Sequence, residues 1–219
     1  MSNSLIQGLA DIYVAPKSLF TELSDKKGWS VIAFLMLLVI NTGVMYSFYS
    51  GMSAMWLVEQ HISVIAHELT PAEIENARAV MGHLADKTKY IVAASMLVIT
   101  PLMMAIIAGY LMLVGNSGRN RPFSDWYAMA VWASMPGLLN MLGLVVLMLL
   151  SNSADMPINT PNYLSLNQLL LNLPPENSWF NWAENFNLIY LWTAALIAVG
   201  LKCWSGYSTV KATLLAIAP

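Results

Sequence analysis

Four long apolar runs alternate with more polar segments along the chain, and none of them has a charged residue in its central part. A helix rises about 1.5 Å per residue, so about 20 apolar residues cross the ~30 Å hydrocarbon layer of a bilayer. The pattern therefore predicts an all-α fold, a polytopic transmembrane helical bundle with four full spans. The spans are expected at Val31–Ser50, Tyr90–Val114, Trp126–Leu150 and Phe186–Cys203.

A further apolar stretch starts at about Ser208 and has about half the length of a span. We interpret it as the start of a fifth transmembrane helix. Two alternatives stay open: a fifth helix that is incomplete in this sequence, or a short helix that lies at the membrane surface.

The segment before the first span, residues 1–30, has the pattern of an amphipathic helix. Pro16 is expected to break or restart that helix, and the segment lacks the basic-then-apolar order of a cleavable signal peptide. Such a segment can lie in the membrane interface or pack on the ends of the spans, and both placements stay open. The apolar residues at helical spacing are Leu5, Ile6, Leu9, Ile12 and Tyr13.

Residues 51–89 are too polar to span, and they predict an external helical hairpin. The sequence Thr70-Pro71-Ala72-Glu73 matches a capping box with proline at the first helical position. We expect the Thr70 hydroxyl to accept from the backbone N–H of Glu73, and the Glu73 carboxylate to reach back. The hairpin should therefore turn near Leu69–Pro71.

Residues 151–185 form a second external segment of different character. Four prolines and many asparagines predict an irregular loop, while Leu164–Leu173 has the pattern of a short interfacial helix. Tryptophan, tyrosine and phenylalanine gather at the ends of the apolar runs. That distribution is typical of the aromatic belts at the two water–lipid borders.

Composition agrees with a membrane protein, because 58% of the residues are hydrophobic and only 10% are charged. The net charge of −2 and the absence of a basic run argue against nucleic-acid partners. One cysteine, Cys203, excludes an internal disulfide, and no pair of histidines has metal-ligand spacing. No catalytic motif is present, so we expect no enzymatic activity, no catalytic residue, no metal and no cofactor.

Lysine and arginine positions predict the orientation. Seven of the ten lie on the side of the N-terminus, and three lie in the long segment 51–89. The N-terminus and the short basic loop with Arg119 and Arg121 are therefore expected in the cytoplasm.

A layer of neutral polar residues and prolines is expected near the middle of the spans. Ionisable groups are absent there, which argues against proton coupling. One interpretation is hydrogen bonding that holds helices together, and the other is a small polar cavity or hinge near the prolines. The residues of this midplane layer are Asn41, Thr42, Thr100, Pro101, Ser134, Pro136 and Asn140.

Several short motifs resemble those of the Yip1-domain family. The most specific is a glycine-containing basic loop, then a phenylalanine, then a Ser-x-Pro inside the following span. Together the motifs cover most of the chain. They are Pro16–Phe20 with Gly28-Trp29, Gly109-Tyr110, Gly118 with Arg119–Phe123, Ser134-Met135-Pro136, and Gly206-Tyr207-Ser208 with Ala212.

The resemblance implies five membrane helices and a cytoplasmic N-terminus. It divides the chain into a cytoplasmic amphipathic segment, residues 1–30, and a transmembrane Yip1-like domain, residues 31–219. Eukaryotic members take part in vesicle traffic and bind Rab GTPases. The chain lacks the long hydrophilic N-terminal region of many such members, which favours a bacterial inner membrane and weighs against GTPase binding.

Two function hypotheses follow. The first is a non-enzymatic integral membrane protein of the Yip1 type, in membrane organisation or a trafficking-like role. It would act through contacts with lipids, with other membrane proteins or with further copies of the chain in a homo-oligomer. The alternative is a small-solute transporter or lipid-translocating protein that uses a polar cavity at the midplane.

Overall fold

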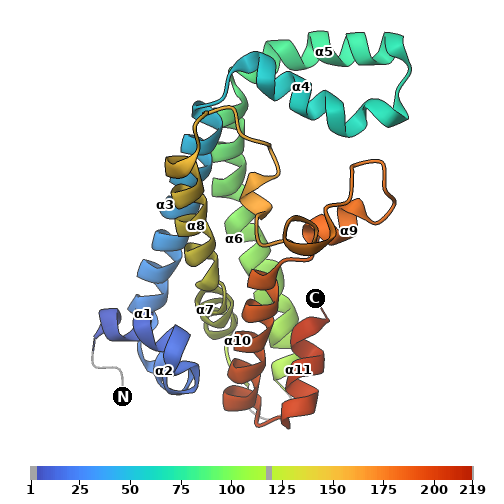
Figure 1. Cartoon of the computed structure of the whole chain (residues 1–219). Coiled ribbons are helices and arrows are strands. Elements are labelled where there is room, and N and C mark those ends of the chain that lie inside the picture. The colour runs from blue at the N-terminus through green and yellow to red at the C-terminus, as the bar shows by residue number, and fades with distance from the viewer. Residues whose placement is uncertain (1–3, 117–119, 219) are drawn as a thin grey trace. The chain divides into compact units, whose positions relative to one another are not determined.

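The computed structural model describes residues 4–116 and 120–218, with the backbone alone for Lys27 and His67 (Figure 1). The described residues form helices and no strand. The helices are α1 Leu5–Val14, α2 Pro16–Glu22, α3 Lys27–Ser50, α4 Ala54–Ile65, α5 Pro71–Ala85, α6 Thr88–Gly115, α7 Phe123–Ala133, α8 Pro136–Leu150, α9 Phe180–Asn185, α10 Leu188–Ser205 and α11 Thr209–Ile217. Short helical turns lie at Leu23–Asp25 (η1), Ala66–Glu68 (η2), Thr160–Asn162 (η3) and Asn167–Leu171 (η4).

Four helical stretches are long and apolar enough to cross a membrane, which confirms the predicted class. Large apolar side chains on them are exposed, with Leu113 at 81% and Leu149 at 79%. Such exposure is expected where lipid is the solvent, because lipid tails are as apolar as leucine. The stretches are Gly28–Ser50, Thr88–Gly115, Phe123–Leu150 and Leu188–Ser205.

The third span is not one continuous helix from Trp126, as the apolar run suggested. It begins at Phe123 and consists of α7 and α8, which meet at Ser134-Met135. Pro136 starts α8 and has no N–H to continue the hydrogen-bond ladder of α7. The fourth span also differs, because it begins at Leu188 and leaves Phe186 in extended backbone.

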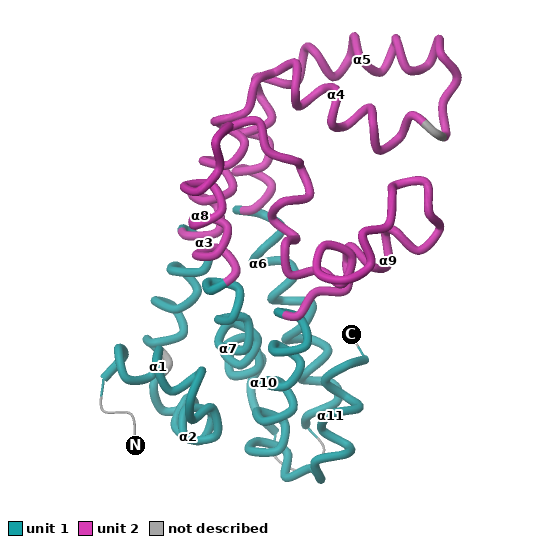
Figure 2. The backbone as a smooth tube through the Cα atoms, in the orientation of Figure 1, with its two compact units in different colours: residues 1–39, 97–139, 189–219 teal, residues 40–96, 140–188 magenta. Residues whose placement is uncertain are grey.

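The chain divides into two compact units, shown in Figure 2. Unit 1 contains Met1–Val39, Leu97–Leu139 and Ile189–Pro219, and unit 2 contains Ile40–Met96 and Asn140–Leu188. Helices α3, α6 and α8 each contribute one part to each unit.

Unit 1 has a core rich in large side chains, and the N-terminal helices belong to it. Ile12 of α1 and Phe20 of α2 are fully buried, together with Trp126 and Trp132 of α7. The Tyr13 hydroxyl donates to the Met135 carbonyl at 2.8 Å. Of the apolar face predicted for this segment, Leu5, Leu9, Ile12 and Tyr13 therefore pack against protein within unit 1, whereas Ile6 is 79% exposed.

Helix α11 also belongs to unit 1, and it occupies the place of the expected fifth helix. Gly206, with φ of 68°, turns the chain between α10 and α11. Ala212 and Ala216 of α11 are buried, and the Tyr110 hydroxyl of α6 donates to the Leu215 carbonyl at 2.8 Å. The short last helix is thus packed against α6.

Unit 2 contains the predicted helical hairpin, formed by α4 and α5 (Figure 1). The capping box is confirmed: the Thr70 hydroxyl accepts from the Glu73 N–H at 3.4 Å, and the Glu73 carboxylate accepts from the Thr70 N–H at 2.8 Å. Val58, Ile62 and Ala85 form the small buried core of the hairpin.

The segment between α8 and α10 is only partly irregular. It contains η3, η4 and the short helix α9. The interfacial helix expected at Leu164–Leu173 is a single π-helical turn, η4, which ends at Asn172 with φ of 47°. The Leu166 N–H donates to the Phe186 carbonyl at 2.8 Å, so the middle of the segment is joined to its end before α10.

Candidate functional site

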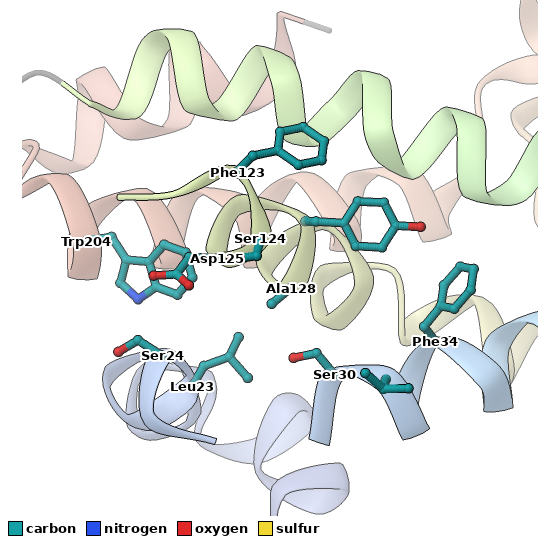
Figure 3. A pocket seen from close by; sticks show the side chains of 11 residues that line it. Leu23, Ser24, Ser30, Phe34, Phe123, Ser124, Asp125, Ala128 and Trp204 are labelled. Atoms are coloured by element: carbon teal, nitrogen blue, oxygen red, sulfur yellow. The ribbon is translucent and has the colours of Figure 1, made fainter. Parts of the chain in front are cut away.

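A cavity of about 440 Å³ lies in unit 1, at the beginnings of α3 and α7. Residues of η1 and α3 face residues of α7 across it, with Trp204 of α10 at one end and Phe34 at the other (Figure 3). Its lining residues are Leu23, Ser24, Ser30, Val31, Phe34, Phe123, Ser124, Asp125, Tyr127, Ala128 and Trp204.

One end of the cavity is aromatic and apolar. The ring of Tyr127 contacts the rings of Phe34 and Phe123, with centroid distances of 5.9 and 6.1 Å. Val31 is 59% exposed and Phe123 is 42% exposed, so this wall continues onto the surface of the spans. An apolar chain in the bilayer can therefore reach the cavity along these side chains.

The other end carries the polar groups. Ser24, Asp125 and Trp204 lie together there in Figure 3. Asp125 is 8% exposed and lies in the first turn of α7, where the helix dipole favours a negative charge. Its Oδ2 accepts from Arg121 Nη1 at 3.3 Å, so the buried carboxylate is paired with a cation.

Arg121 is held in place by several contacts. Its backbone N–H donates to Asn116 Oδ1 at 3.1 Å, and Trp126 Nε1 donates to the same oxygen at 3.2 Å. The guanidinium lies 4.4 Å from the centre of the Trp204 ring. The Nε of Arg121 is buried and has no hydrogen-bond partner among the described residues. A buried donor without a partner is unusual in folded proteins, because nearly all buried N–H groups are paired with an acceptor.

Ser30 closes the middle of the cavity wall. It is 9% exposed, and its Oγ accepts from Nε1 of the fully buried Trp132 at 3.1 Å. This hydrogen bond joins the start of α3 to α7 and so holds the two walls of the cavity together.

The comparison with protein families decides the identity of the chain. Residues 10–219 match the Yip1 domain. The chain belongs to the Yip1 family. No curated protein and no solved structure matches it.

The structure places only part of the predicted basic loop at the cavity of this Yip1-family protein. Arg121 pairs with Asp125 at the polar end. Arg119 lies outside the described residues. The described residues contain no group of three or more His, Cys, Asp or Glu side chains that could hold a metal ion.

The predicted midplane layer is separate from this cavity, because none of its seven residues lines it. In unit 1, Thr100 is half-buried, Pro101 lies inside the continuous helix α6, and the Ser134 hydroxyl donates to the Ala130 carbonyl of its own helix at 2.9 Å. Pro136 is buried at the start of α8.

The remaining members of the layer lie in unit 2. Asn140 Nδ2 donates to the Pro161 carbonyl at 3.3 Å, and the Asn140 carbonyl accepts from the Tyr163 hydroxyl at 3.3 Å. Asn41 is half-buried. Asn140 Oδ1 and Thr42 Oγ1 are buried and have no partner among the described residues.

Sequence reasoning missed the cavity and its acidic residue, Asp125. A local signal was present, because Asp125 lies between the aromatic residues Phe123 and Trp126 at the start of an apolar run. A lone acid at a span end is usually a solvated cap, so the sequence did not distinguish it. Asp125 is paired with Arg121, whose guanidinium lies over the ring of Trp204, and Trp204 is distant in the chain.

Proposed function

We propose that this Yip1-family membrane protein acts without catalysis, through contacts with lipids of the bilayer, and that the cavity of unit 1 takes the acyl chain of a phospholipid. Yip1-family proteins are generally non-enzymatic membrane proteins. The observation that carries the proposal is the division of one cavity into an aromatic, apolar end and a polar end with a paired Asp125. An amphiphile has the same two parts, an apolar chain and a polar head, and could place one at each end of the cavity.

The apolar end suits an acyl chain because it continues onto exposed side chains of two membrane spans. Its volume, about 440 Å³, lies within the range of ligand pockets. The polar end offers hydroxyls of Ser24 and Ser124, and the Arg121 guanidinium lies next to it. Arginine is a preferred residue for phosphate, which is the group that follows the acyl chains in a phospholipid.

The proposal includes the orientation inferred from the lysines and arginines. With the N-terminus in the cytoplasm, the cavity would open to the cytoplasmic leaflet, and a bacterial inner membrane is the membrane we favour. Contacts with another copy of the chain or with other membrane proteins remain predictions.

Photo-crosslinking in lipid nanodiscs tests the proposal. A phospholipid with a diazirine in its acyl chain is added, and labelled peptides are mapped by mass spectrometry. We expect preferred labelling near Phe34 and Tyr127. Ala128→Trp fills the cavity and should reduce that labelling several-fold, whereas Ala195→Trp, at an exposed position of α10, should leave it unchanged.

Thermal unfolding of each variant shows that it is folded before the labels are compared, since overpacking costs about 1–3 kcal/mol. Equal labelling over all exposed apolar side chains, unchanged by Ala128→Trp in a folded protein, would contradict lipid binding in the cavity.

A further inference from the structure

A second cavity, of about 450 Å³, lies in unit 2 between α4 and the segment that joins α8 to α10. Its lining is unlike that of the first cavity, because amide side chains dominate it. They are Gln60, Asn159, Asn162, Asn167, Gln168 and Asn172. This amide cavity is also lined by one carboxylate, that of Glu184, and by one aromatic ring, that of Phe180.

Glu184 is the unusual member of the amide cavity. It is 7% exposed, and its hydrogen-bond partners among the described residues are neutral: Asn167 Nδ2 donates to it at 3.1 Å, and Gln168 Nε2 donates to both of its oxygens at 3.3 Å. The described residues provide no ion pair for Glu184. A buried carboxylate without a counter-charge is costly.

The surrounding sequence provides no cation either. There is no lysine or arginine from residue 122 to residue 201. Arg78 of the hairpin is paired with Glu59 and Glu75, at 2.8 and 3.0 Å. The residues that α4 gives to the cavity, Gln60, Ser63 and Val64, are neutral. Among the described residues, the lining of the amide cavity therefore has the Glu184 carboxylate and no cationic side chain.

The carboxylate is also held in a fixed position. Asn167 is 3% exposed, its Oδ1 accepts from the Leu173 N–H at 2.8 Å, and its Nδ2 is directed at Glu184. The bond at Oδ1, and a second bond from Nδ2 to the Leu173 carbonyl at 3.4 Å, thus fix the Asn167 amide that donates to the carboxylate. A carboxylate has about four acceptor positions, so acceptor capacity remains after these bonds.

We propose that the amide cavity binds a primary ammonium group, with Glu184 as its counter-charge. An ammonium has three donors, and the Glu184 carboxylate together with the amide oxygens of Gln168 and Asn159 offers the acceptors that it needs. The Phe180 ring, which also lines the cavity, adds an attraction for a cation.

Hydrogen bonding gives this site a preference among cations. A quaternary ammonium has no N–H and leaves the amide oxygens and the carboxylate without donors. The site should therefore favour an ethanolamine group over a choline group. An ethanolamine group can come from a phospholipid headgroup or from a soluble amine, and the chemistry of the cavity is the same for both.

Thermal unfolding of the full chain in detergent tests this proposal with four probes: short-chain phosphatidylethanolamine, short-chain phosphatidylcholine, free ethanolamine and free choline. We expect a concentration-dependent stabilisation by at least one ethanolamine compound, and an affinity at least ten-fold weaker for its choline counterpart. Stabilisation by the lipid alone identifies a headgroup site, and stabilisation by free ethanolamine identifies a site for soluble amines.

The decisive variant is Glu184→Gln, which keeps the shape of the side chain and removes its charge. It should weaken ethanolamine binding at least ten-fold, while Glu176→Gln, at an exposed acid of the same segment, should leave it unchanged. If Glu184→Gln does not fold, Asn159→Leu removes an amide acceptor of the lining and should weaken binding several-fold.

Three results with the ethanolamine and choline probes would overturn the proposal. They are equal affinity for ethanolamine and choline compounds, unchanged ethanolamine binding in a folded Glu184→Gln or Asn159→Leu protein, and no stabilisation by either ethanolamine compound. Binding of an uncharged sugar with the same affinity in the wild type and in Glu184→Gln would also overturn it, because the site would then be a saccharide site.

Discussion

The hydrogen bond between Trp132 and Ser30 should determine how well the two walls of the unit 1 cavity stay together. Trp132 is fully buried and Ser30 is 9% exposed, and Nε1 donates to Oγ at 3.1 Å. Ser30→Ala removes the acceptor and leaves a buried indole N–H without a partner. An orphaned buried donor costs about 1–3 kcal/mol, so we expect Ser30→Ala to destabilise the protein by about that amount.

The same substitution should matter little once the donor is gone. In a Trp132→Phe protein no indole N–H remains, so Ser30→Ala should then change the free energy of unfolding by less than about 0.5 kcal/mol. The coupling free energy between the two positions is therefore expected to be about 0.5–3 kcal/mol, which is the range found for contacting residues. Trp132→Phe has its own cost because the smaller ring leaves space in the core.

Reversible unfolding by sodium dodecyl sulfate in mixed micelles, followed by circular dichroism, measures all four proteins of this double-mutant cycle. Equal costs of Ser30→Ala in the two backgrounds would refute the reasoning. In that case water in the cavity would satisfy the indole, and Ser30 would have no role in joining the walls.

Three further predictions use other parts of the chain. A cysteine probe at Asn159 should react with an impermeant reagent from outside and one at Asn120 should not; the reverse labelling would refute the orientation. Asn140→Leu removes both the 3.3 Å hydrogen bond to the Pro161 carbonyl and the unpartnered Oδ1, so thermal unfolding should show a cost below about 1 kcal/mol. Any cellular phenotype should be kept. A lost phenotype at unchanged abundance would indicate a functional cavity. Hydrogen bonds from the Thr70 side chain and backbone lower the pKa of Glu73 below its ordinary value of 4.5. These bonds therefore stabilise the hairpin fully above pH 4.5, and the stabilisation is lost as the pH falls through the lower pKa that Glu73 has in the folded protein. The protection factors of amides in the first turn of α5, which correct for the slower intrinsic exchange in acid, should therefore fall as the pH is lowered. A Glu73→Gln protein whose protection factors keep the same pH dependence would contradict this.

Features set by neighbouring residues were predictable from the sequence. The capping box needs only Thr70, Pro71 and Glu73, which are close in the chain, so the start of α5 was predicted correctly. The four spans were predictable for a related reason. Length and apolar composition determine whether a helix can cross a bilayer, and both are properties of one continuous segment.

Features set by distant residues were not predictable. The break between α7 and α8 is one case, because a proline inside an apolar run can either kink a helix or start a new one, as Pro101 and Pro136 illustrate. Pro101 lies within α6 without ending it, and Pro136 begins α8. The local sequence signal is the same in both, and packing around each proline decides the outcome.

Contacts with residues distant in the chain also determine what each of the two cavities can bind. Asp125 and Glu184 are both acids near the ends of membrane spans, and from sequence patterns alone both would be expected at the solvated surface. Packing separates them: Asp125 has the Arg121 guanidinium at 3.3 Å, whereas Glu184 has only amide donors. A carboxylate that is already neutralised suits the polar end of a lipid cavity, and one that lacks a counter-charge suits a cationic ligand. The different charge balance of two similar residues is therefore the physical reason for assigning different ligands to the two sites.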